Sequence, residues 1–509
     1  MGGARTRTAR LAPNLSGRHG HWSGYAIALL VPIIVAGGLV ARPLHDAGLL
    51  WPALGLAVLG GLLACRTALR SNALRVPAAM LVFWLVLLAW FPLALSRTPD
   101  RFAGDREVTY LAQAALWTIP ALLLTRGRAG GVRAQRRGWI LALVLCCAIA
   151  TWEITTGQHL WIAAQNPWPF GDAPRAAGTF INPNNLAAAL VAMIAAATAA
   201  LATLTGPVAL HPPGIEEDGL DDGLDGGAFE DAFEAGRRTS RRLWLRIEQL
   251  VLAVLIAYGS VIIVLSGSRA ALAALVGVVV LQGWRILRER AGGRGVLALL
   301  RRHLGVVVGL AVAGVAAFLG LLFAPERLIA RNPLRRIVFG HLDPATAASD
   351  DLRAGLVRAA LRYLRDSDYL GSGAGSFEAL LAADPNPGVI ARTNLHQAFV
   401  ELVSQYGVVV GAAFAVAVLV LIGALLGSAV RDRRRTAGAA RERRIARHEA
   451  YGYLLSYGAF GASASSALSY PAWWLTLTAA AAIAWWLAGS RIRRQGYSAS
   501  RRSVSPSSM

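Results

Sequence analysis

The sequence contains no lysine. All 51 basic side chains among its 509 residues are arginines, which excludes Schiff-base chemistry and a Walker-type phosphate-binding lysine. Cysteine is also scarce: Cys65, Cys146 and Cys147 lie in apolar stretches, so the sequence predicts neither a disulfide framework nor a paired-cysteine metal site. Only 16% of the residues are charged and 55% are apolar, which is typical of a membrane protein.

Twelve apolar runs are long enough to span a bilayer. A hydrocarbon core about 30 Å thick requires roughly 20 apolar residues, and a helix satisfies every backbone hydrogen bond within the segment. The predicted spans are residues 23–41, 48–65, 76–95, 109–124, 138–156, 184–205, 247–265, 270–287, 304–324, 404–427, 450–468 and 472–488. The first run is too long for a signal peptide and lacks a clear small-residue cleavage site, so we expect an uncleaved span. The predicted fold class is an all-α polytopic membrane protein.

The arginines predict the orientation of these spans, because short cytoplasmic loops carry the excess of positive charge. If the loops alternate between the two sides, 36 of the 51 arginines lie on the side of both termini and 15 on the other, nine of those in one segment. We therefore expect both termini to be cytoplasmic and the protein to be a multi-pass protein of the inner membrane. The net charge of +22 then reflects topology and does not indicate a nucleic-acid partner.

This topology divides the chain into seven parts. They are a basic cytoplasmic N-terminus (1–22), spans 1 to 6 (23–205), an acidic cytoplasmic insert (206–246), spans 7 to 9 (247–324), a partly helical periplasmic loop (325–403), spans 10 to 12 (404–488) and a basic cytoplasmic tail (489–509). Nine acids between Glu216 and Glu234, with many glycines, predict a disordered tether in the insert. A binding role there would be regulatory at most.

The long loop concentrates the polar chemistry of the chain. Ser349 or Asp350 is predicted to cap a helix that extends to about Ser367. On that helix, a solvated stripe contains Arg358, Arg362 and Arg365. Arg353 instead projects into the middle of the apolar arc, so either an anion binds there or the first turn frays and the side chain reaches water.

A second polar stretch leads into span 10. Gln397, Glu401 and Gln405 recur every four residues and form one stripe, which at membrane depth faces protein or a water-filled cavity. His396 lies at the mouth of this stripe, and Arg392 lies close before it.

Two shorter segments on the same predicted side also contain polar candidates. Arg269 is the one charge in the turn between spans 7 and 8. Arg175, Asn182 and Asn184 precede span 6, where an Asn-Pro turn and a helix cap are the structural alternative to a binding role.

Four motifs together resemble the O-antigen ligase and polymerase superfamily of bacterial envelope glycan enzymes. They are GTFINPNN at 178–185, SGSRAA at 266–271, the R-x4-R helix leading to GSGAGSF at 353–377, and LHQAFVELVSQYG at 395–407. Each motif alone is weak, whereas their order, the long loop and the twelve spans make the joint match specific. The resemblance covers roughly residues 100 to 430.

The resemblance implies a glycan donor linked to undecaprenyl diphosphate, a lipid or glycan acceptor, and transfer at the periplasmic face without nucleotide sugar, metal or other cofactor. It implies that Arg269 and Arg353 hold the diphosphate and that His396 acts near the acceptor hydroxyl. The sequence departs from the family pattern in Gln397, where Asn is usual, and in Gln405, where Glu is common. Both departures concern the orientation of the histidine ring and the acceptor contacts.

The chemistry suits these residue types. An arginine fork meets phosphate oxygens in a bidentate manner, so the leaving diphosphate requires no divalent ion. A histidine whose pKa lies near neutrality can accept the hydroxyl proton, which contributes about 10² to 10⁴ in rate. We expect inversion at the anomeric carbon. Further residues are expected to line the substrate cavity: Arg175, Asn182, Asn184, Arg358, Arg392, Gln397 and Glu401.

Several alternatives remain open. Asp366 and Asp368 mimic the acidic pair of metal-dependent glycosyltransferases, but their place at a helix end favours a polar break. Within the family, two other enzymes would use the same kind of donor and differ only in the acceptor. One is a polymerase that extends a second lipid-linked glycan, and the other is an enzyme that glycosylates protein. A transporter or flippase would predict internal repeats and interrupted helices at mid-membrane, and we find no such repeat.

Overall fold

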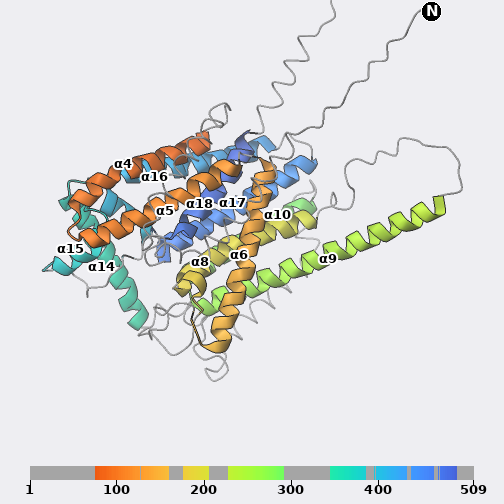
Figure 1. The fold of residues 1–509 in the computed structure, drawn as a ribbon, viewed down its shortest axis with the longest axis horizontal. Coiled ribbons are helices and arrows are strands. Elements are labelled where there is room, and N and C mark those ends of the chain that lie inside the picture. Colours follow the sequence, from red (N-terminus) through yellow and green to blue (C-terminus); the bar gives the residue numbers. More distant parts are fainter. Residues whose placement is uncertain are drawn as a thin grey trace, which may run out of the picture.

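A computed structural model describes residues 75–125, 128–159, 176–180, 182–205, 227–291, 344–385, 395, 397–432, 437–463, 468 and 470–489. The chain in these ranges is helical and contains no strand (Figure 1). Predicted spans 1, 2 and 9, both termini and residues 206–226 of the insert lie outside them. So do the site candidates Arg175, Arg392 and His396.

Nine long helices correspond to predicted spans 3 to 8 and 10 to 12. They are α4 (Arg75–Arg97), α5 (Arg101–Thr125), α6 (Ala129–Thr156), α8 (Pro183–Leu204), α9 (Gly227–Ser266), α10 (Arg269–Ala291), α16 (Ala398–Asp432), α17 (Ala437–Ser463) and α18 (Pro471–Gly489). Within the described chain, seven segments are long and apolar enough to cross a membrane, and they lie in α4, α6, α8, α9 from Leu243 onward, α10, α16 and α18. A multi-pass membrane fold is thereby supported, while the count of twelve spans stays a prediction.

Two helix starts differ from the sequence predictions. α9 begins at Gly227, so the predicted disorder of the insert is wrong for residues 227–246. α14 (Pro344–Asp366) begins before the predicted cap, because Pro344 opens its first turn with a backbone angle already suited to a helix.

Small side chains allow the central helices to approach closely. α8 is almost entirely buried and rich in alanine. It packs against α17, where a Cβ added at Gly452 would lie 2.4 Å from the Cβ of Ala195. The glycine and the alanine thus bring the two backbones together, as is usual for helices that associate in membranes. On α18, the indole of Trp473 stacks on Tyr457 at 4.5 Å and donates to its carbonyl at 2.9 Å.

Polar contacts group the helix ends at two ends of the bundle. At one end, Arg441 of α17 donates to the carbonyl of Ala202 in α8 at 2.6 Å. Arg443 donates to the carbonyl of Leu487 in α18 at 2.6 Å and to Asp432 of α16 at 2.7 Å. These are the C-terminal ends of α8, α16 and α18, so the three helices run in the same direction, as the predicted loop alternation requires.

At the other end lie the N-terminal ends of the same helices, together with α14 and the short helix α15 (Ser376–Ala383) (Figure 1). The hydroxyl of Tyr470, just before α18, donates to the carbonyl of Phe180, just before α8, at 3.0 Å. Arg97 at the C-terminal end of α4 donates to the carbonyl of Ser367 at 2.9 Å. The predicted periplasmic segments therefore gather at one end, although which end faces the periplasm stays a prediction.

Candidate active site

The arginine helix α14 has its own small apolar core. Leu356, Ala360 and Tyr363 of α14 are buried against Phe377 and Leu381 of α15. The apolar arc that the sequence predicted is therefore the packed face of this helix. Arg353, which was predicted to project into that arc, is half-buried. Arg358 and Arg365 are exposed, as predicted for the solvated stripe.

Arg362, the third arginine of that stripe, forms an ion pair. Its guanidinium forms an ion pair with Asp384, which follows α15, and the hydroxyl of Tyr363 donates to the same carboxylate oxygen at 2.9 Å. The side chain of Arg362 is thus half-buried. The side chain is still 38% exposed, so Arg362 keeps the solvated position that the sequence predicted. Its pairing could not be predicted, because Asp384 lies 22 residues further along the chain, beyond the reach of any helical periodicity.

The GSGAGS loop after α14 docks into a kink of α16. α16 bends at Gly407, where φ is 84° and ψ is 172°, so the helical hydrogen bonds are interrupted there. The backbone N–H of Ser372 donates to the carbonyl of Ser404 at 2.9 Å, and that of Gly373 to the carbonyl of Gln405 at 3.1 Å. In return, the N–H of Val408 donates to the carbonyl of Tyr369 at 3.0 Å. The loop thus satisfies the backbone groups that the kink exposes.

The same loop is held on its other side by α4 and α5. The N–H of Ala374 donates to the carbonyl of Ala94 at 3.1 Å. A Cβ added at Gly373 would lie 2.6 Å from the N of Thr98, and one at Gly375 would lie 2.6 Å from the carbonyl oxygen of Ala103. Both glycines also have positive φ values, 110° and 60°. This glycine interlock, residues 369–376, fixes α14 between the ends of three long helices.

The polar stripe at the start of α16 faces protein. Gln405 accepts from the backbone N–H of Gly375 at 2.6 Å and donates to Glu401 at 3.4 Å. Glu401 and Gln405 are buried, while Gln397 is half-buried. The sequence prediction that this stripe faces protein or a cavity is confirmed for its inner two members, whose contacts hold the glycine interlock. A substrate contact for Glu401 stays a prediction.

Glu107 of α5 is a half-buried acid that the sequence reasoning missed. Its carboxylate accepts from the hydroxyl of Tyr406 at 2.8 Å. Glu401 also acts on it electrostatically, and Arg106 is the nearby base. Burial, which opposes ionisation, raises the pKa of Glu107 to about 7. The sequence did contain one sign of this residue, since Glu107 is an acid only two residues before a predicted span.

This raised pKa predicts the pH dependence of stability. Glu107 lies before predicted span 4, and its pKa is higher in the folded than in the unfolded protein, so folding favours the protonated form. The stability that the protonated carboxyl of Glu107 contributes is complete below its ordinary pKa of 4.5. This stability is lost as the pH rises through the folded-state pKa of about 7. We expect the melting temperature in detergent to fall between pH 5 and pH 8, and Glu107→Gln to reduce that slope.

Asp105 is the matched control for this experiment, because it lies on the same helix but is exposed. Asp105→Asn should retain the wild-type slope. Identical slopes in wild type and Glu107→Gln would contradict the assignment.

Glu153 is a fully buried acid that the sequence reasoning also missed. It is 1% exposed near the C-terminal end of α6, where its Oε2 accepts from the backbone N–H groups of Ala177 and Gly178 at 2.8 and 2.7 Å. His159 lies 3.4 Å from its Oε1. Glu153 therefore holds the segment that leads into α8, the predicted polar approach to span 6. An acid inside an apolar run was the signal for it.

Asn182 caps α8. Its side-chain oxygen accepts from the backbone N–H of Asn184 at 2.8 Å, and Pro183 occupies the first turn. The structural alternative given for Asn182 is thus observed, and its side chain is 6% exposed. Asn184 is half-buried and Asn185 fully buried.

Arg269 opens α10 immediately after the turn that the sequence predicted. Gly267 adopts a φ of 70°, and Ser268 caps the helix by accepting from the backbone N–H of Ala271 at 3.4 Å. Arg269 is half-buried. A guanidinium at a helix N-terminus adds to the positive end of the dipole, which suits an anion.

The described structure is that of a multi-pass helical membrane protein in which α14 and α15 are fixed at one end of the bundle. Residues 252–415 match the sequence model of the family described as O-antigen ligase. The match includes Arg269, α14, the glycine interlock and the kink of α16, and so confirms the predicted resemblance, which supports a glycosyltransferase or ligase function acting on glycans at a membrane. No curated protein matches the chain.

Proposed function

We propose that this protein transfers a glycan from an undecaprenyl diphosphate carrier to an acceptor hydroxyl at the periplasmic face of the inner membrane. The observation that carries the proposal is the glycine interlock. It fixes α14, which contains Arg353, against the kinked helix α16, which begins two residues after His396. Catalysis of this type depends on holding donor and acceptor groups in fixed geometry.

Arg269 and Arg353 bind the donor diphosphate in this proposal. Both side chains are half-buried, where partial removal of water strengthens the attraction between a guanidinium and a phosphate. As the bond between the anomeric carbon and the diphosphate oxygen breaks, negative charge grows on the phosphate, and the two arginines stabilise that charge. The reaction therefore requires no metal ion.

His396 accepts the proton of the acceptor hydroxyl as its oxygen attacks the anomeric carbon, which inverts that centre. Several other residues line the two substrates: Arg175, Asn182, Asn184, Arg358, Arg392, Gln397 and Glu401. Asn182 contributes through the turn that it caps, since its side chain holds the start of α8.

The test is transfer by purified protein in nanodiscs, with EDTA present and a defined undecaprenyl-diphosphate glycan as donor. We expect product from the wild type and a loss of about 10² to 10⁴ in rate for His396→Ala, the range for one acid–base group. Arg353→Gln should lose transfer as well, whereas Arg365→Gln, an exposed arginine on the same helix, should not. Wild-type rates in both His396→Ala and Arg353→Gln would refute the assigned roles.

The acceptors decide between a ligase and a polymerase. Lipid A core and a second lipid-linked glycan are offered in parallel, and the acceptor that receives the product identifies the reaction. An absence of product on any acceptor, with folded protein and intact donor, would favour transport instead.

A further inference from the structure

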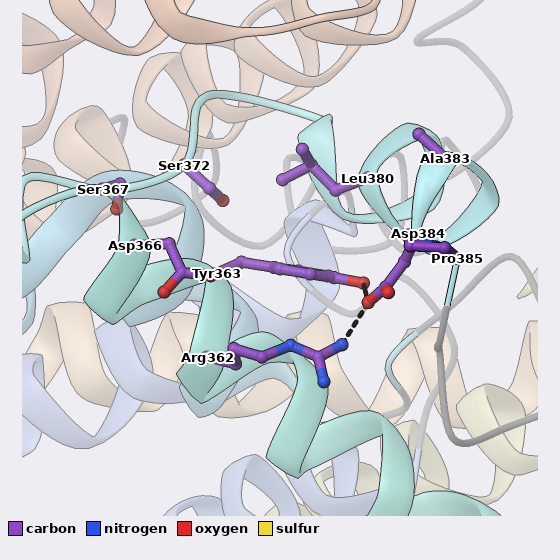
Figure 2. A pocket seen from close by; sticks show the side chains of 9 residues that line it. All are labelled: Arg362, Tyr363, Asp366, Ser367, Ser372, Leu380, Ala383, Asp384 and Pro385. Atoms are coloured by element: carbon purple, nitrogen blue, oxygen red, sulfur yellow. Dashed lines mark hydrogen bonds and ion pairs between the residues drawn. The ribbon is translucent and has the colours of Figure 1, made fainter.

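A pocket lies between the C-terminal half of α14, the glycine interlock and α15 (Figure 2). Its cavity volume is about 410 Å³, within the range of roughly 300 to 1,000 Å³ that is usual for small-ligand sites. Arg362 and Asp384 line one end and Asp366 the other, with the ring of Tyr363 between them. Leu380 lies across the cavity from that ring (Figure 2).

The charges of the lining argue against a phosphate. Two carboxylates, Asp366 and Asp384, face the pocket with one guanidinium, that of Arg362. Since Arg362 is already paired with Asp384, the balance is one negative charge. An anionic ligand would be repelled, so this pocket is not a second diphosphate site.

The lining fits a neutral ligand that has several hydroxyl groups. Carboxylates only accept hydrogen bonds and a guanidinium only donates them, whereas a hydroxyl does both. Ser367 and Ser372 add hydroxyl groups, and Leu380 and Pro385 supply apolar surface for the C–H face of a sugar ring. Acids, one base, hydroxyls and apolar side chains around one cavity can together bind a pyranose.

The pocket is also held rigidly. The hydroxyl of Ser372 lies 2.8 Å from that of Ser376 and donates to the carbonyl of Ser404 in α16 at 3.0 Å. Asp384 is held by Arg362 and Tyr363. A preformed pocket loses little conformational entropy when a ligand binds.

The pocket is separate from the predicted diphosphate site. Arg362 follows Arg353 by nine residues, which is about 14 Å along a helix and two and a half turns around it. The two arginines therefore project from opposite sides of α14. One sugar cannot contact both, so an occupant of the pocket lies away from the bond that is transferred.

We propose that this pocket binds a neutral pyranose unit of the glycan, remote from the reacting carbon. The inference rests on the proposed glycan transfer and adds a subsite to it. Such a sugar belongs either to the donor or to the acceptor, and its recognition is the same in both cases. Binding there selects substrates by the sugars they carry beyond the first unit.

The experiment compares KM and kcat for substrates with one sugar and with several sugars, varied separately on donor and acceptor. Asp366→Asn should fold normally, because Asp366 is exposed at the end of α14. Leu380→Trp places a larger side chain in the cavity. Both variants should raise KM about tenfold for the substrate with several sugars, on either the donor or the acceptor. The kcat and the KM for the substrate with one sugar should be unchanged. Glu378→Gln, exposed on α15 and outside the lining, is the matched control.

Unchanged KM values for long donor and long acceptor in both variants would overturn the pocket assignment and leave glycan transfer intact. If the wild type transfers nothing, saturation-transfer NMR with the carrier-free oligosaccharide tests whether the pocket binds a sugar. Signal in the wild type that is lost in Leu380→Trp supports the sugar subsite, and equal signal in the two refutes it.

Discussion

Gly373→Ala is expected to abolish glycan transfer and to lower the melting temperature of the purified protein. Gly373 has a φ of 110°, and an added Cβ would lie 2.6 Å from the N of Thr98 and 2.8 Å from the carbonyl carbon of Arg97. The backbone conformation costs roughly 1 to 3 kcal/mol for a residue other than glycine, and overpacking costs about as much again. Backbone atoms cannot move aside as a flexible side chain does.

Transfer is lost because the interlock couples α14 to α16. If the loop shifts, the N–H of Gly373 no longer reaches the carbonyl of Gln405, and Arg353 moves relative to the start of α16. A displacement of about 1 Å at a catalytic group can cost 10²-fold in rate. Differential scanning fluorimetry and the transfer assay report the two effects separately.

Gly423→Ala is the control, since Gly423 lies in α16 and a Cβ there would meet nothing within 4 Å. It should keep the transfer rate and stabilise slightly, because alanine favours a helix over glycine by roughly 0.5 to 1 kcal/mol. Wild-type stability and transfer in Gly373→Ala would show that the interlock does not fix the site.

The sequence predicted the positions of the long helices well but not the features that join them. Apolar runs of bilayer length determine a span locally, and hence α4, α8 and α18 are found close to their predicted ranges. The kink at Gly407 could not be predicted in this way. The sequence stays apolar beyond Gly407 and so gives no sign of a break in the helix. The residues that bond to the kink, including Tyr369, lie far away in the sequence.

The candidate site was predictable to a similar degree. Periodicity identified the packed face of α14 and the exposed Arg358, because burial on a helix repeats every 3.6 residues. It could not predict the ion pair between Arg362 and Asp384, which depends on how α15 folds back onto α14. Glu107 was missed for the same reason, since its hydroxyl donor, Tyr406, comes from another helix.

Glu449→Ala is expected to destabilise the protein by about 3 to 5 kcal/mol, the usual cost of breaking a buried ion pair. Arg136 of α6 donates from Nε to both carboxylate oxygens of Glu449 in α17 at 3.1 Å, and from Nη2 to one of them at 2.7 Å. Tyr453 donates to the same carboxylate at 3.1 Å. The side chains of Arg136 and Glu449 are 7% and 1% exposed, so removing the acid leaves a buried guanidinium without a counter-ion.

The same two helices supply a matched pair for comparison. Arg133 and Glu442 also form an ion pair at 3.1 Å, but their side chains are 58% and 42% exposed. Water screens that pair, so Glu442→Ala should cost less than about 1 kcal/mol. Denaturant or thermal unfolding in detergent measures both changes, and equal losses would contradict the burial argument.

The double variant Arg136→Leu/Glu449→Leu separates the charge from the packing. If the cost of Glu449→Ala comes from the uncompensated guanidinium, replacing both partners with apolar side chains should recover most of the lost stability. If the loss persists, the hydrogen bonds of the pair are themselves needed to join α17 to α6. Because this pair lies toward the arginine-rich end of α17, away from the glycine interlock, the double variant should keep glycan transfer whenever it folds.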